Sequence, residues 1–171
     1  RHPVLRQFST ELDTEKITVI LGRSGCGKTT LLRILAGLES LDGGEILFEK
    51  QEKLGVVFQE PRLMPWLTLE QNILFGADKK TYSKNQLKER AEGLLKLTGL
   101  EKFGNAYPDQ LSGGMMQRAA LGRVLACDAS YLLLDEPFAA LDHFTRQTMQ
   151  KEFLRICAEE RMGALFVTHS V

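Results

Sequence analysis

The sequence predicts an α/β fold in which a mainly parallel sheet is flanked by helices and a mostly helical segment interrupts the alternation. Strand-like and helix-like runs alternate at both ends of the chain, whereas the middle, about residues 63–125, is mostly helical in its spacing. The strand-like runs are apolar along nearly their whole length, as in parallel sheets that are buried on both faces. A chain of 171 residues is long enough for one domain with its own core.

The expected strands are short apolar runs that end at glycine or at polar residues. They cover residues 17–21, 45–48, 55–58, 131–134 and 164–168. A helix is expected over residues 28–36, with Gly37 as its C-terminal cap. Ser83 and Gln86 form a capping box, and the helix behind them carries on one face Leu87, Ala91, Leu94, Leu95 and Thr98 before Gly99 ends it. Asp142 can cap a last helix, whose inward residues are Met149, Phe153, Ile156 and Cys157.

The charge balance and the cysteines exclude several classes of protein. Lysine plus arginine number 22 and aspartate plus glutamate number 22, so nothing predicts a nucleic-acid or anionic-membrane surface. No apolar run approaches the roughly 18–20 residues that cross a bilayer, and no signal peptide opens the chain. We therefore expect a soluble protein that reaches a membrane only through a partner. The three cysteines, Cys26, Cys127 and Cys157, lack metal-ligand spacing, which favours a reduced, cytoplasmic setting.

Residues 22–29 match the pattern G-x-x-x-x-G-K-[ST] between an expected strand and an expected helix. Glycines let backbone N–H groups face phosphate oxygens, and the helix N-terminus adds partial positive charge. Lys28 can reach the β- and γ-phosphates, and the Thr29 hydroxyl can ligate Mg²⁺. The expected nucleotide-binding residues of this loop are Gly22, Arg23, Ser24, Gly25, Cys26, Gly27, Lys28, Thr29 and Thr30. The alternative is a glycine turn with a surface lysine, and Cys26 is either a reactive thiol or a small residue that fits there.

Two acids, Asp135 and Glu136, follow the apolar run 131–134. Ligands of open α/β sheets bind at the carboxyl ends of strands, which is where the glycine loop also lies. Asp135 can hold Mg²⁺ through water, and Glu136 can act as general base on an attacking water. Alternatively, the two acids and Pro137 simply begin a helix.

Gln59 and His169 also follow expected strands. The Gln59 amide could reach Mg²⁺ or the attacking water, and the His169 side chain could touch the γ-phosphate. By itself, however, Gln59 is equally well explained as a solvated loop residue. His169 taken by itself is better explained as a structural hydrogen-bonding residue, and its position at the end of an expected strand beside the other two is what favours the phosphate contact.

The run Leu-Ser-Gly-Gly-Met at residues 111–115 predicts a second anion site. Ser112 can cap the following helix, and Gly113 and Gly114 leave the helix N-terminus uncovered by side chains. One chain therefore carries two phosphate-binding helix starts.

In this order, and nearly from end to end, these motifs resemble the nucleotide-binding domain of ATP-binding cassette (ABC) proteins. The resemblance implies that residues 22–29 are the Walker A loop and that residues 111–115 are the signature, here with Met115 in place of glutamine. It implies the Q-loop role for Gln59, the Walker B and catalytic-base roles for Asp135 and Glu136, the D-loop role for residues 140–142 with Asp142 near the nucleotide, and the switch role for His169.

The resemblance also implies the P-loop NTPase fold, with a RecA-like core at about residues 1–62 and 126–171 and a helical subdomain at about 63–125 that carries the signature. Only His2 and Phe8 are available to stack on adenine, and Phe8 is alternatively a core residue. The stretch 48–54 is short for the family, and the chain ends two residues after His169. We therefore expect a truncated form of the domain.

The segment 59–73 and the run 166–170 resemble importers of the nitrate, sulfonate and taurine group. This resemblance implies ATP and Mg²⁺ as cofactors, a second nucleotide-binding subunit as homodimer partner, transmembrane permease subunits and, indirectly, a solute-binding protein, with no nucleic acid. The expected location is the cytoplasmic face of the inner membrane, and the expected cargo is a small anionic solute. Leu63, Met64, Trp66 and Leu67 form an apolar loop that either receives a permease helix or, through Trp66, packs into the domain's own core.

Two rival functions fit the sequence less well. A non-transport ABC ATPase of translation usually carries two cassettes, and one of DNA repair inserts a long coiled coil between Lys28 and Asp135, where this chain has no heptad run. A P-loop kinase or small GTPase would leave residues 111–115 and His169 unexplained.

Overall fold

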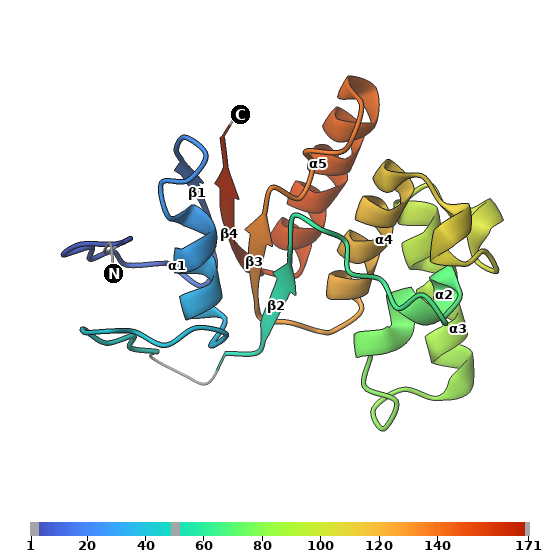
Figure 1. Ribbon diagram of the computed structural model, residues 1–171. Coiled ribbons are helices and arrows are strands. Elements are labelled where there is room, and N and C mark those ends of the chain that lie inside the picture. Colours follow the sequence, from blue (N-terminus) through green and yellow to red (C-terminus); the bar gives the residue numbers. More distant parts are fainter. Residues whose placement is uncertain (1–3, 49–51, 170–171) are drawn as a thin grey trace.

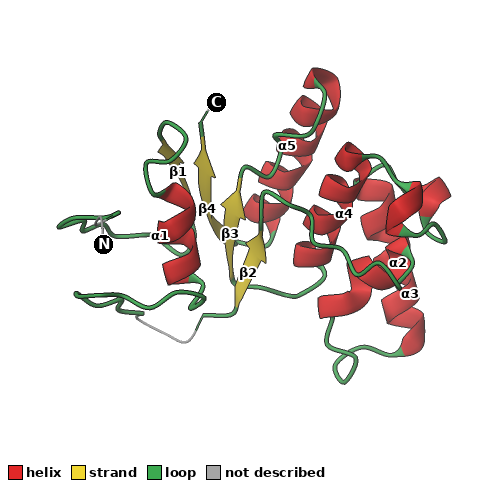
Figure 2. Cartoon of the chain, viewed as in Figure 1, coloured by secondary structure: helices red, strands yellow, loops and turns green. Residues whose placement is uncertain are grey.

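The computed structural model describes residues 4–48 and 52–169. Its centre is a four-stranded parallel sheet in the order β1-β4-β3-β2. The strands are β1 (Ile17–Leu21), β2 (Leu54–Val57), β3 (Tyr131–Asp135) and β4 (Gly163–Thr168). All four run in the same direction, so their carboxyl ends lie along one edge of the sheet (Figures 1 and 2).

Five α-helices surround or extend this sheet: α1 (Lys28–Leu35), α2 (Leu69–Ile73), α3 (Lys84–Leu97), α4 (Gly113–Leu125) and α5 (His143–Glu159). Short 3₁₀ turns at Leu74–Gly76, Glu101–Phe103 and Pro108–Gln110 connect the helices of the middle segment. Among the described residues, no helix is both long enough and apolar enough to cross a membrane.

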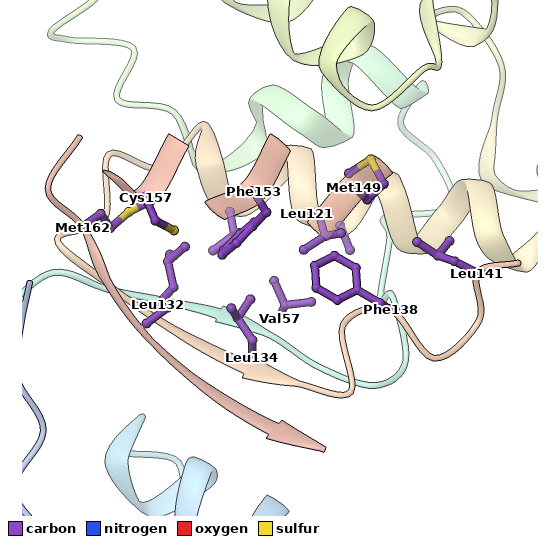
Figure 3. Packing of buried hydrophobic residues seen from close by; sticks show 13 residues of the cluster. Val57, Leu121, Leu132, Leu134, Phe138, Leu141, Met149, Phe153, Cys157 and Met162 are labelled. Carbon is purple, nitrogen blue, oxygen red and sulfur yellow. The ribbon is translucent and has the colours of Figure 1, made fainter. Parts of the chain in front are cut away.

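The two faces of the sheet are covered by different helices because strand side chains alternate between faces. Leu133 and Leu165 pack with Leu32 of α1 on one face. On the opposite face, side chains of β3 and β4 pack with α4 and α5, as Figure 3 shows for Leu132, Leu134, Leu121, Phe153 and Cys157. Phe138, which follows β3, stacks on Phe166 and contacts Phe153 edge to face. These rings extend the core to the carboxyl ends of β3 and β4.

The middle segment has an apolar cluster of its own, formed by Leu69, Ile73, Ala77, Leu95, Leu100, Leu111, Ala119 and Ala126. Helix α4 belongs to both clusters, since Ala120, Leu121 and Val124 pack on the sheet side. Close approach of α4 to β2 requires Gly55, where a Cβ would lie 2.5 Å from Val124 Cγ2. We propose on this basis that residues 63–125 form the helical subdomain, joined to the sheet by α4.

Most of the expected elements are present, with one correction. Residues 45–48 are not a strand: Leu47 and Phe48 are exposed, and these residues pair with no strand in the described part of the chain. Their apolar residue types predicted a strand, but no neighbouring strand of the described chain supplies the hydrogen bonds that a strand needs. The capping box of Ser83 with Gln86 and the cap of α5 by Asp142 are confirmed. Phe8 is exposed rather than core, and His2 lies outside the described residues.

Candidate functional site

The glycine loop joins the end of β1 to the start of α1 (Figure 1). Gly25 and Gly27 adopt left-handed backbone angles, with φ of 80° and 99°, which side chains rarely tolerate. Within residues 4–48 and 52–169, no side chain caps the N-terminus of α1. The first N–H groups of the helix therefore remain available for an anion, as the motif predicts.

The Lys28 side chain bends back onto the glycine loop. Its Nζ donates to the carbonyl oxygens of Gly22 at 2.7 Å and Arg23 at 3.0 Å, and lies 3.9 Å from Cys26 Sγ. These carbonyls hold the ammonium group beside the uncapped helix N-terminus. A phosphate group entering the loop would meet both the cation and the N–H groups.

The residues expected to hold Mg²⁺, Thr29 and Asp135, come together across the start of α1 and the end of β3. Asp135 is only 3% exposed. Burial raises the pKa of its carboxyl group above the ordinary value, and a hydrogen bond with the Thr29 side chain partly opposes this shift. A buried carboxylate beside a hydroxyl is a fitting oxygen pair for Mg²⁺, which usually takes one or two protein ligands and completes its shell with phosphate and water.

Glu136 is held by the end of β4. Its Oε2 accepts a hydrogen bond from Thr168 Oγ1 at 2.8 Å, and its Oε1 lies 2.6 Å from His169 Nδ1. Its backbone φ is 47°, a left-handed value for a residue that also precedes proline. Strain of this kind costs on the order of 1–3 kcal/mol and persists where surrounding contacts fix it. Glu136 is therefore fixed both at its backbone and at its carboxylate, and its role as general base stays a prediction.

The signature residues lie at the N-terminus of α4. Ser112 caps the helix, its Oγ accepting from Met115 N at 3.3 Å. Gly113 has open space where a side chain would be, and a Cβ on Gly114 would lie 3.3 Å from Ala140 O. The helix start is therefore accessible, and it packs against the predicted D-loop. Met115 contributes its backbone N–H to the cap and packs against the apolar cluster of the middle segment.

Asp142 is engaged as the N-cap of α5, accepting from Thr145 N at 3.1 Å. Hydrogen bonds with the Thr145 side chain and then with its backbone hold the pKa of the Asp142 carboxyl group below the ordinary value. Arg146 donates to Leu141 O at 3.0 Å and so ties the D-loop to the same helix. Asp142 thus helps to fix the D-loop at the start of α5. Its place near a nucleotide stays a prediction.

Gln59 follows β2 at the same edge of the sheet but lies apart from the other residues. It is exposed and makes no hydrogen bond within the described part of the chain. Strands β3 and β4 separate β2 from β1 and its glycine loop. Its predicted contact with Mg²⁺ or water therefore requires the loop to move or a ligand to extend towards it.

The loop after Gln59 is fixed by two residues that sequence reasoning missed. Asn72 is fully buried, accepts from Met64 N at 2.7 Å and donates to the carbonyls of Met64, Leu67 and Thr68. Arg123 of α4 donates to the carbonyls of Pro61 and Arg62, each at 2.8 Å. Their only sequence signal is that a polar residue stands at an inward helix position. Trp66 projects from this fixed loop and is 69% exposed.

Comparison with known families matches residues 5–139 to the ABC transporter family. The chain belongs to the ABC transporter family. The P-loop NTPase fold expected from the sequence is confirmed by a solved structure of a dimeric ATP-binding cassette in a post-hydrolysis state, bound to ADP and Pi. It matches with a TM-score of 0.89 at 30% identity, covering 98% of this chain and 80% of that one.

Two curated ABC relatives are similar over nearly all of this chain. An uncharacterized ABC transporter ATP-binding protein of Methanocaldococcus jannaschii is 46% identical, covering 100% of this chain and 66% of the relative. An aliphatic sulfonates import ATP-binding protein of Pseudomonas syringae pv. tomato is 47% identical, covering 99% of this chain and 71% of the relative. The chain thus spans about two thirds of the length of these curated relatives.

Proposed function

We propose that this ABC-family chain binds and hydrolyses ATP as the nucleotide-binding subunit of a transporter, in the importer group that handles nitrate, sulfonate and taurine. The observation that carries the proposal is the Glu136 carboxylate, which is strained in its backbone and held by Thr168 and His169 beside the glycine loop. The similarity to relatives named as sulfonate importers supports the transport role. A cargo that is a small anion follows from that similarity alone.

In the proposed reaction, water attacks the γ-phosphorus of ATP, and the bond from that phosphorus to the β–γ bridging oxygen breaks. The attacking water gives its proton to the Glu136 carboxylate, and ADP and phosphate leave. Lys28 and the N-terminus of α1 would hold the phosphates, and His169, which lies beside Glu136, would contact the γ-phosphate. Bound Mg²⁺, held by Thr29 and Asp135, would neutralise phosphate charge.

The test of this chemistry is the Glu136→Gln variant. The change keeps the size and hydrogen bonding of the side chain but removes the basic carboxylate. General bases typically contribute about 10²–10⁴ in rate, so turnover should fall by that order while ATP still binds. His169→Ala should also slow hydrolysis. Near-normal ATP turnover in both variants would refute the catalytic assignment.

We further propose that two chains complete each site. Helices α1 and α4 cover opposite faces of the sheet, so the glycine loop and the signature lie on opposite sides of the molecule in Figure 1. One chain cannot bring Ser112 onto the nucleotide held by its own Lys28. A two-fold axis would place Lys28 of one chain opposite Ser112 and Gly114 of the other, and would form two sites at once. The dimeric cassette structure supports this arrangement.

Sedimentation of the Glu136→Gln variant tests the dimer. We expect dimer with Mg-ATP, monomer with ADP, and monomer with Mg-ATP once Ser112→Arg is added. Ser83→Arg is the matched control, because Ser83 caps α3 as Ser112 caps α4 but lies outside the proposed interface. Wild-type hydrolysis should rise more than linearly with protein concentration. Strictly linear activity that survives Ser112→Arg would show that each chain acts alone.

The partner proposed for the Trp66 loop is a short cytoplasmic helix of a transmembrane permease subunit, served in turn by a solute-binding protein. Trp66 is exposed while the backbone around it is fixed by Asn72 and Arg123. An apolar side chain presented on a rigid loop is the kind of anchor that dominates protein interfaces. The chain would then act at the cytoplasmic face of the membrane.

A further inference from the structure

Thr168 is in contact with two separate parts of the site. It is the last residue of β4, which lies between β1 and β3 in the sheet. Its backbone oxygen accepts from Gly22 N, the first residue of the glycine loop, at 3.3 Å. Its side-chain Oγ1 donates to Glu136 Oε2 at 2.8 Å. One residue therefore joins the phosphate-binding loop to the proposed general base.

We propose that Thr168 is a positioning residue, whose hydroxyl fixes the Glu136 carboxylate relative to the phosphate-binding loop. The inference rests on the proposed ATP hydrolysis and adds to it a residue that the motifs do not single out. Thr168 acts through Glu136, since its hydroxyl is directed to the carboxylate.

Glu136 needs such a contact because its own side chain is long and flexible. The backbone of Glu136 is fixed by its N–H, which donates to Val167 O at 3.0 Å. This bond continues the pairing of β3 with β4 one residue beyond Asp135, which is opposite Val167 in the register. The backbone alone leaves the side-chain torsions free. A misplacement of about 1 Å of a reacting group can cost on the order of a hundredfold in rate.

The two residues that contact the Glu136 carboxylate differ in solvent exposure. The His169 side chain is 60% exposed, whereas Thr168 is half-buried. Thr168 belongs to the strand itself, and His169 follows the end of the strand. When His169 turns towards the γ-phosphate, it gives up its contact with Oε1. The Thr168 hydroxyl then remains on Oε2 and keeps the carboxylate aimed at the water.

The Thr168→Val variant removes the hydroxyl and preserves the β-branched shape at the strand end. In the full chain, we expect kcat for ATP hydrolysis to fall about tenfold, which is equivalent to about 1.4 kcal/mol. The KM for ATP should stay within about twofold, because the contact with the phosphate-binding loop is made by the Thr168 backbone, which the substitution keeps. Thr168→Ser retains the hydroxyl and should keep kcat within about threefold of wild type. Thr148→Val is the matched control, since the Thr148 hydroxyl donates to the Phe144 carbonyl within α5.

A double-mutant cycle separates positioning from general damage. In the Glu136→Gln background, Thr168→Val should change the residual rate by less than about twofold, because the group that it positions no longer acts as a base. Melting temperatures of all variants check that the fold is intact.

Three results would overturn the inference while leaving ATP hydrolysis assigned to this chain. The first is a wild-type kcat in Thr168→Val when Glu136→Gln is inactive. The second is an equal loss in Thr168→Ser and Thr168→Val, which would assign the effect to packing. The third is a full additional loss in the Glu136→Gln background. By contrast, an inactive wild-type chain, or an active Glu136→Gln variant, would count against the proposed function itself.

Discussion

The exposed position of Trp66 allows a quantitative prediction that separates a docking residue from a core residue. A fully buried tryptophan removes roughly 150–250 Å² from water. At 69% exposure, about a third of that area is buried, or roughly 50–80 Å². At about 25 cal/mol per Å², Trp66→Ala should therefore cost the fold at most about 1–2 kcal/mol. Truncation of a core tryptophan typically costs about 3–5 kcal/mol.

The assay measures stability and binding in the same variant. Each 1 kcal/mol lowers the melting temperature of a domain this size by about 2–4 °C, so Trp66→Ala should stay within about 8 °C of wild type and bind ATP normally. Its affinity for the permease subunits should fall by about 30-fold or more, as for an interface anchor worth about 2 kcal/mol. Phe103→Ala, another exposed aromatic of the middle segment, is the control and should leave permease binding unchanged.

Asn72→Ala tests whether permease binding also needs the fixed backbone of the same loop. It deletes the amide that bonds the loop backbone and leaves the Met64 N–H without its acceptor, which should cost about 1–3 kcal/mol. Both the melting temperature and permease affinity should fall. The reasoning would be refuted by a loss of more than about 3 kcal/mol in Trp66→Ala, or by unchanged permease affinity in that variant.

Two further changes test the nucleotide site. Lys28→Ala removes the cation above the glycine loop, so ATP affinity and turnover should both fall, and a binding titration at wild-type level would reject the loop assignment. Asp135→Asn should abolish Mg²⁺-dependent turnover while raising the melting temperature at neutral pH, because burial raises the pKa of the Asp135 carboxyl group and its charge therefore opposes folding. Between the unfolded pKa of about 4 and the raised folded pKa, folding of the wild-type chain binds a proton. The difference in melting temperature between Asp135→Asn and wild type should therefore disappear as pH falls through that interval. A difference that stays constant in thermal melts across pH would contradict the prediction.

The fold was largely predictable because its signals are local. Strand β3 is buried at every position, and β4 is buried or nearly so, which explains why apolar runs alone identified both. The caps at Ser83 and Asp142 are short-range patterns of side chain to backbone. The strand predicted at residues 45–48 was wrong for the complementary reason. A strand needs a partner, and four residues of sequence do not reveal whether one is present.

The site was predictable where a motif determines both residue type and backbone shape, as in the glycine loop. It was not predictable where one residue of the site holds another. The sequence around Thr168 does not indicate that its hydroxyl donates to Glu136, because the pairing of β3 with β4 is what brings the two residues together. Arg123 was missed for the same reason, because its partners are backbone carbonyls about sixty residues earlier in the chain. Asn72 bonds the backbone of the loop just before its own helix, and no motif marks such a contact.

Helix α4 connects the two surfaces on which the proposed function depends. Its first turn carries Ser112 as cap, and Gly114 packs against the D-loop. Near its other end, Arg123 holds the backbone of Pro61 and Arg62, which leads from Gln59 to Trp66. A force applied to Trp66 by a docked permease helix would therefore reach α4 through Arg123 and move the signature relative to the sheet. Cutting that link with Arg123→Ala should leave ATP binding by the isolated chain intact but weaken the stimulation of hydrolysis by the permease, which a comparison of ATPase rates with and without the permease would measure. Equal stimulation of the variant and wild type would show that the coupling takes another route.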